Sequence, residues 1–245
     1  MQLITITGGQ TLHGRIRPAA AKNSVLPLLA ATLLCRTPSR LRAVPPLADV
    51  ATSLALLQSV GAKAERQGSD LFVAPGQDLQ GEIPDYLAGA MRSSVFYLAP
   101  LLCRVGEVRL PLPGGCKLGP RPVDIHLAGL AAMGAQVELE GIAVTLRRRG
   151  PLHGVDFALR LPSVGATMTL MMAATQAGGT TILRGAACEP EICDLANFLR
   201  ACGAHITGAG TPVVVIQGGK PLQGTAWTPL QVGEGQAGLR KTNLI

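Results

Sequence analysis

Cys116 is the residue of this chain that is best placed to do chemistry. It lies in the segment 113–126, where three glycines and three prolines precede Val123 and exclude a regular helix or strand. Lys117 and Arg121 flank the thiol with positive charge, which favours an acidic thiol and suits a bound anion. An ordinary surface loop with a stray cysteine is the alternative. The segment predicts an exposed, reactive thiol beside an anion site.

Two further cations begin apolar segments that have the length of helices. Lys22 starts the segment 22–35 and Arg92 starts 92–103, and Gly165 takes the same place in a third segment, 165–177. A cation at a helix N-terminus opposes the helix dipole by roughly 0.3–1 kcal/mol. A bound anion reverses this sign, because free N–H groups and side-chain charge then act together. The pair predicts an anion site, and two side chains that merely reach into solvent are the alternative.

The elements that must position these residues recur three times along the chain. Three short amphipathic helices end at Gly61, Gly134 and Gly203, which are 73 and 69 residues apart, and a pair of strands follows each. The three apolar segments are apolar on every side, so we expect them to be inner helices. The predicted class is α/β, with one domain of three α-β-α-β-β units around buried helices. The predicted strand pairs are 63–66 with 70–74, 137–140 with 142–147, and 205–207 with 212–217.

Composition narrows the partners of this domain. Hydrophobic residues make up 47 % of the chain and its net charge is +7, which admits nucleic acid or small anions. The seven aromatic residues do not interleave with the basic ones, so small anions fit better than nucleic acid. The longest apolar runs are shorter than the roughly 18 residues of a membrane span. The start of the chain has no signal-peptide pattern, and the six cysteines form no zinc motif. We expect a cytoplasmic protein with no membrane segment, metal or other cofactor.

Three motifs carry a resemblance to a known family. They are Lys22-Asn23, the run Gly-Gly-Cys-x-Leu-Gly-x-Arg-Pro-Val-Asp-x-His at 114–126, and Ser-Val-Gly-Ala-Thr at 163–167. Over about residues 1–220 the chain resembles the UDP-N-acetylglucosamine 1-carboxyvinyltransferases, enolpyruvyl transferases that open peptidoglycan synthesis and so serve cell-wall growth, cell shape and division. The resemblance implies an inside-out α/β barrel, with three units in one domain and three in a second. It also implies transfer of the enolpyruvyl group of phosphoenolpyruvate to the 3′-hydroxyl of UDP-N-acetylglucosamine, with release of phosphate.

The resemblance also implies a role for each matching residue. Cys116 would be the general acid that protonates the phosphoenolpyruvate methylene, after closure of its loop over the substrates. Phosphoenolpyruvate would be held by Lys22, Asn23 and Arg121. The UDP-sugar would be lined by Arg92, Arg121, Pro122, Val123, Asp124, Ile125, Leu161, Pro162, Ser163 and Val164.

Several departures from the family limit what carries over. Leu161 stands where the family has a lysine, Pro162 follows it, and Phe96 replaces a common tryptophan. We expect residues 1–20 to be a strand of an absent second domain, 21–220 to be the catalytic-loop domain, and 221–245 to be an atypical, disordered tail. Because the second domain supplies the base in the family, we expect very low or no activity from this truncated chain without a complementary domain. The alternatives are an enzyme similar to 5-enolpyruvylshikimate-3-phosphate synthase and a non-catalytic binding domain.

Overall fold

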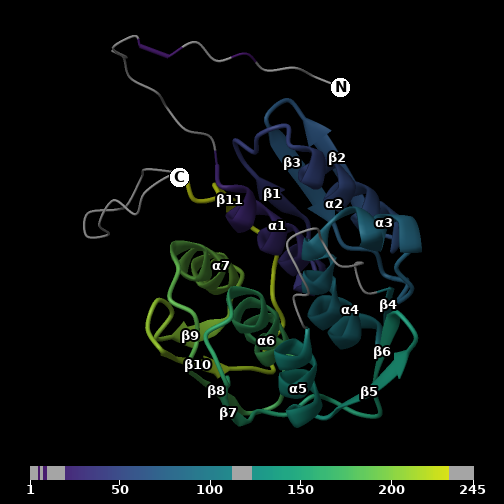
Figure 1. Ribbon diagram of the computed structural model, residues 1–245, viewed down its shortest axis with the longest axis vertical. Coiled ribbons are helices and arrows are strands. Elements are labelled where there is room, and N and C mark those ends of the chain that lie inside the picture. Colours follow the sequence, from purple (N-terminus) through teal and green to yellow (C-terminus); the bar gives the residue numbers. More distant parts are fainter. Residues whose placement is uncertain (1–4, 6–7, 10–19, 112–122, 232–245) are drawn as a thin grey trace.

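Three copies of one α-β-α-β-β unit build the computed structural model of the chain (Figure 1). The structure describes residues 5, 8–9, 20–111 and 123–231. The first unit contains α1 (Lys22–Ala31), the short 3₁₀ helix η1 (Thr32–Leu34), β1 (Ser39–Leu41), α2 (Ala48–Ser59), β2 (Lys63–Gln67) and β3 (Asp70–Ala74). The second contains α3 (Asp85–Ala90), the 3₁₀ helix η2 (Arg92–Tyr97), α4 (Leu98–Val105), β4 (Glu107–Pro111), α5 (Asp124–Ala132), β5 (Ala135–Glu140) and β6 (Ala143–Arg148). The third contains β7 (Asp156–Ala158), α6 (Val164–Gln176), β8 (Thr180–Arg184), α7 (Pro190–Ala201), β9 (His205–Thr207) and β10 (Val213–Gln217), and β11 (Ala226–Trp227) follows it.

Each unit contributes one sheet, and the sheets surround the inner helices α1, α4 and α6 (Figure 1). The strand orders are β11-β1-β3-β2, β4-β6-β5 and β7-β8-β10-β9. Pairing is antiparallel except between β1 and β11 and between β7 and β8. In α6 every residue from Ala166 to Thr175 is buried, because the helix packs against α4, α5, α7 and η2 and against β8 and β10 and so has no solvent-facing side. The predicted α/β class and the three units around buried helices are confirmed. Among the described residues, the strands form three separate sheets and not one closed barrel.

The second inner helix differs from the prediction of one continuous helix over 92–103. It begins as η2 and becomes α-helical only at Leu98. Pro100 has no N–H to donate to the carbonyl of Phe96, so the chain preceding it does not close a regular α-helical turn. The preceding helix α3 was not predicted. Six residues are too few to show a helical period in the sequence.

Residues 221–231 differ from the disordered tail expected there. The backbone N–H groups of Arg40 and Arg42, on the outer edge of β1, donate to the carbonyls of Thr225 (2.9 Å) and Trp227 (2.7 Å). The Trp227 ring packs edge-on against Phe198 of α7, with 6.2 Å between the ring centroids. A two-residue strand has no period to detect, and it is ordered here because it pairs an open sheet edge and buries an aromatic ring. Residues 232–245 and most of 1–19 lie outside the described residues.

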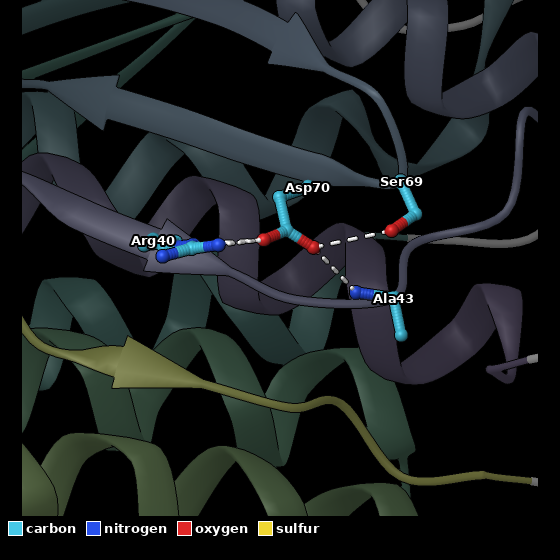
Figure 2. Close-up of polar contacts among 4 residues, drawn as sticks. All are labelled: Arg40, Ala43, Ser69 and Asp70. Carbon is cyan, nitrogen blue, oxygen red and sulfur yellow. Dashed lines mark hydrogen bonds and ion pairs between the residues drawn. The ribbon is translucent and has the colours of Figure 1, made fainter.

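A carboxylate fixes the turn that leads from β1 towards α2. Figure 2 shows Asp70 accepting hydrogen bonds from Arg40 Nε (2.8 Å), from the Ala43 N–H (3.0 Å) and from Ser69 Oγ (3.3 Å). The Ala43 N–H and the Arg40 guanidinium together lower the pKa of Asp70. Ala43 has a φ of +51°, a conformation that non-glycine residues adopt only with support. The anchored turn leads to α2, whose first turn contains Asp49, the ion-pair partner of Lys22.

Candidate functional site

The start of α1 presents two of the residues predicted to bind phosphoenolpyruvate. Lys22 and Asn23 are exposed, whereas Ser24 and the rest of the helix are buried. In the described part of the chain, no side chain caps the helix at Ala21. Lys22 Nζ lies 2.9 Å from Asp49 Oδ2 in the first turn of α2, so a carboxylate already balances the predicted cation. An incoming anion at this helix start would have to share or replace that partner.

Arg92 also begins a helix, as predicted, but that helix is the 3₁₀ helix η2. Its side chain is half-buried. The helix η2 packs against both α1 and α6. The structure therefore brings the element that starts with Arg92 against the two other inner helices that carry candidate residues.

The starts of α5 and α6 meet and join two of the predicted sugar-nucleotide segments. Asp124, in the first turn of α5, forms an ion pair with Arg160, 2.5 Å between Oδ2 and Nη2. Desolvation raises the pKa of Asp124, but the hydrogen bond and charge of Arg160 outweigh it and leave the pKa below its ordinary value. Because Arg160 directly precedes Leu161, this ion pair holds the segment 161–164 beside Val123 and Ile125.

His126 of α5 is buried at the same junction, where it packs against Gly165 of α6. The residue is 7 % exposed, and neither ring nitrogen has a hydrogen-bond partner among the described residues. A Cβ added at Gly165 would lie 2.8 Å from His126 Nε2, so the ring fills the space that this glycine leaves. Burial lowers the pKa of His126 from 6.5 to about 4, which keeps the imidazole neutral near pH 7.

The first turn of α6 leaves backbone N–H groups available beside this junction. Ser163 is the N-cap, and its Oγ accepts a hydrogen bond from the Ala166 N–H at 3.3 Å. Leu161 and Pro162 are exposed, and Ser163 and Val164 are half-buried. Among the described residues, no side chain caps the other N–H groups at the start of α6, an arrangement that suits phosphate oxygens.

Three of the predicted site residues, Cys116, Arg121 and Pro122, lie outside the described residues. Their segment connects Pro111 at the end of β4 to Val123 at the start of α5. Arg160, Asp49 and His126 were missed as site residues. The signal for Arg160 was a cation directly before the segment 161–164, and the signal for His126 was its place in the motif at 114–126.

Two hollows of the described surface contain none of the candidate residues. One of about 390 Å³ is lined by Arg200, His205 and Gln217, and another of about 570 Å³ lies over β2 and β3. In the described part of the chain, no three His, Cys, Asp or Glu side chains are grouped to hold a metal ion. The helices described there are also too short or too polar to cross a bilayer.

The sequence of this chain is similar to a known protein family and to curated relatives. The model of the EPSP synthase (3-phosphoshikimate 1-carboxyvinyltransferase) family matches residues 6–228. UDP-N-acetylglucosamine 1-carboxyvinyltransferase of Cellvibrio japonicus is 45 % identical over 225 residues, covering 91 % of this chain and 54 % of the relative. The protein of the same name from Nitratidesulfovibrio vulgaris is 47 % identical over 224 residues, covering 91 % and 53 %. The chain therefore spans about half the length of the curated relatives it matches.

Solved structures agree on the fold. The enolpyruvyl transferase NikO from Streptomyces tendae aligns with a TM-score of 0.79 at 24 % identity, over 91 % of this chain and 53 % of that one. EPSP synthase from Acinetobacter baumannii aligns with a TM-score of 0.71 at 18 % identity, over 88 % and 49 %. At these identities the likeness concerns the arrangement of helices and strands alone.

Proposed function

This chain belongs to the EPSP synthase family of carboxyvinyltransferases, and on that premise we propose that it is the sugar-nucleotide-binding half of a UDP-N-acetylglucosamine 1-carboxyvinyltransferase. The whole enzyme transfers the enolpyruvyl group of phosphoenolpyruvate to the 3′-hydroxyl of UDP-N-acetylglucosamine and releases phosphate. In this proposal the product enters peptidoglycan synthesis, and with it cell-wall growth, cell shape and division. Both substrates are soluble anionic metabolites, so the same proposal places the protein in the cytoplasm.

The observation that carries the proposal is the junction of α5 and α6. The Asp124–Arg160 ion pair and the packing of His126 on Gly165 hold two helix starts side by side. Helix starts of this kind present N–H groups to phosphate oxygens, and a nucleoside diphosphate carries two phosphates to be held. We assign the UDP-sugar to this junction, with Arg92 of the neighbouring η2 as a further cation.

Phosphoenolpyruvate is assigned to Lys22, Asn23 and Arg121, and the acid that protonates its methylene to Cys116. Lys22 and Asn23 are exposed at the start of α1, as an anion-binding pair needs to be. A thiol has an ordinary pKa of about 8.5, and a bound anion beside it offsets the flanking cations and keeps it protonated at neutral pH, so it can donate its proton to carbon in the transition state. The segment that carries Cys116 and Arg121 directly precedes α5 in the sequence, and α5 forms one side of the sugar-nucleotide junction.

The family description names a different acceptor substrate, 3-phosphoshikimate. A binding measurement distinguishes this substrate from UDP-N-acetylglucosamine. Isothermal titration of the purified 245-residue chain should show saturable binding of UDP-N-acetylglucosamine and none of shikimate 3-phosphate. Arg160→Ala, which frees Asp124, should weaken binding of the nucleotide by about fivefold or more. The matched control is Arg184→Ala, which breaks the exposed Arg184–Asp156 ion pair (2.7 Å) between β7 and β8 and should leave binding unchanged. Binding of shikimate 3-phosphate alone would contradict the proposal.

Catalysis is tested by adding the part of a relative's length that this chain does not span. The chain is mixed with a separately produced second half of a curated relative, and phosphate release from phosphoenolpyruvate is followed with UDP-N-acetylglucosamine present. Release should depend on both halves and disappear in Cys116→Ala. If the mixture that contains Cys116→Ala still released phosphate, Cys116 would not be the catalytic acid. A mixture that binds the nucleotide but releases no phosphate would favour the non-catalytic binding domain.

A further inference from the structure

A buried carboxylate joins three separate parts of the chain behind the start of α1. Asp194 of α7 is 7 % exposed. Its Oδ1 accepts a hydrogen bond from Trp227 Nε1 (2.9 Å), and its Oδ2 accepts one from the Leu230 N–H (2.9 Å) and one from Ser24 Oγ. All three donors are uncharged. A buried carboxylate is costly unless hydrogen bonds satisfy it, so these bonds hold the three segments together.

The repeat does not require a carboxylate at this position. Counting back nine residues from the glycines that end the outer helices gives Thr52, Ile125 and Asp194. Thr52 donates to the Ala48 carbonyl within its own helix, and Ile125 is buried. An acid therefore occurs at this position in the third unit alone, and its role lies outside the common architecture.

Comparison of the three inner helices also shows that the bond between Ser24 and Asp194 is not part of the common architecture. Ser24, Ser94 and Thr167 take equivalent positions, and all three are fully buried. Ser94 Oγ donates to the Ala88 carbonyl at 3.2 Å, and Thr167 Oγ1 accepts from the Ala187 N–H at 3.1 Å. Two of the hydroxyls thus bond to nearby backbone. Ser24 instead bonds to a side chain 170 residues away in the sequence.

Asp194 and its partner Leu230 together anchor the chain on both sides of the exposed pair Lys22 and Asn23. On one side, Ala20 bridges to Gln231, and the Ala21 N–H donates to the Leu230 carbonyl at 3.1 Å. On the other side, Ser24 is tied to the carboxylate. Lys22 and Asn23 stand between these two anchored points, so their backbone can shift little while both anchors hold. A negative charge near the first turn of a helix is also favourable to the helix dipole.

We infer that Asp194 is a positioning residue that locks the start of α1 to the segment 226–231 and so fixes Lys22 and Asn23 for phosphoenolpyruvate, an inference that rests on the proposed function. Asp194 touches no substrate in this inference. It acts through Ser24 on one side and through Leu230 on the other. A substitution of either partner should loosen the same short stretch of chain.

The first measurement follows the anchor itself, without any ligand. Amide hydrogen exchange at Ala21 and Val25 is compared in the unaltered chain, Ser24→Ala and Asp194→Asn. Both variants should exchange at least tenfold faster at these two amides. Ser24→Ala removes the hydroxyl that donates to Asp194, and Asp194→Asn leaves one acceptor oxygen where aspartate has two. Thr32→Val is the matched control. It removes a buried hydroxyl that bonds to the Leu29 carbonyl at the far end of the same helix, and it should leave exchange at Ala21 and Val25 unchanged.

The second measurement asks whether the anchor matters to one substrate and not the other. By isothermal titration, Ser24→Ala and Asp194→Asn should bind phosphoenolpyruvate at least fivefold more weakly, with the affinity for UDP-N-acetylglucosamine within twofold of the unaltered chain. Ser24→Thr keeps the hydroxyl, as Thr167 does in the third unit, and should restore the affinity for phosphoenolpyruvate. Thr32→Val should change neither affinity.

The outcomes separate this inference from the proposed function. An unaltered chain that binds neither phosphoenolpyruvate nor UDP-N-acetylglucosamine overturns the proposed function, whatever the exchange rates are. A chain that binds both, and keeps its affinity for phosphoenolpyruvate in Ser24→Ala and Asp194→Asn, overturns the positioning role alone. Equal loss of both affinities in the two variants would show general loosening and would overturn the inference as well.

Discussion

The replacement His126→Leu should change how the stability of the chain depends on pH. His126 is buried where α5 meets Gly165 at the start of α6, and its ring nitrogens have no hydrogen-bond partner among the described residues. Burial lowers its pKa from 6.5 to about 4, against the raising effects of the nearby Val123 carbonyl and the Asp124 carboxylate. The folded chain therefore keeps a neutral imidazole in a pH range where the unfolded chain protonates it.

The sign and size of the effect follow from that difference. Above pH 6.5 both states hold a neutral ring, and the full stability is present. As the pH falls below 6.5, the unfolded chain binds a proton that the folded chain does not, so the free energy of unfolding falls until about pH 4. At about 1.36 kcal/mol per pH unit, the interval from 6.5 to about 4 is worth about 3 kcal/mol. At pH 5 the loss is about 2 kcal/mol.

Urea unfolding followed by circular dichroism at pH 7.5 and pH 5 measures this difference. The unaltered chain should lose about 2 kcal/mol more than His126→Leu between the two pH values. At pH 7.5 the variant should be less stable by under about 1.5 kcal/mol, since leucine is similar in size and leaves no unpaired nitrogen. His153→Gln, which removes an exposed imidazole, is the control and should keep the pH dependence of the unaltered chain. Parallel pH curves for the unaltered chain and His126→Leu would refute the argument that burial keeps this ring neutral.

Three further predictions test the packing around the site. Gly165→Ala places a Cβ 2.8 Å from His126 Nε2 and should lower the thermal midpoint and the affinity for UDP-N-acetylglucosamine, whereas Gly89→Ala, with open space around its Cβ, should do neither. Tyr97→Phe removes the partner of buried Ser53 Oγ (2.5 Å) and should cost about 1–2 kcal/mol of stability. The double variant with Ser53→Ala should cost less than the sum of the two single ones, and additive costs in a double-mutant cycle would contradict the contact. Burial raises the pKa of half-buried Cys103 to about 12, so iodoacetamide at pH 7.5 should label exposed Cys188 much faster than Cys103 in the folded chain, as peptide mass spectrometry would show. Equal labelling of the two thiols in the folded chain would disagree with this burial.

Much of the fold could be predicted from short-range signals in the sequence. The helix-ending glycines Gly61, Gly134 and Gly203 have φ values of +94°, +103° and +109°, a conformation that glycine adopts without steric cost. The strand pairs that follow them, and the burial of the three apolar helices, depend on periodicity within each segment. The motifs at 22–23, 114–126 and 163–167 led to the family. Such features lie within a few residues of one another, so the sequence displays them directly.

The contacts that build the site depend on tertiary structure. Lys22 meets Asp49, and Asp124 meets Arg160 across 36 positions of sequence. Asp194 meets Ser24 across 170 positions, and the segment 226–231 returns to pair with β1 and the start of α1. No local pattern selects these partners, because any of several carboxylates could satisfy a given donor. The packing of three similar units selects them, since it sets which helix starts face each other and which buried hydroxyl is left without a backbone partner of its own.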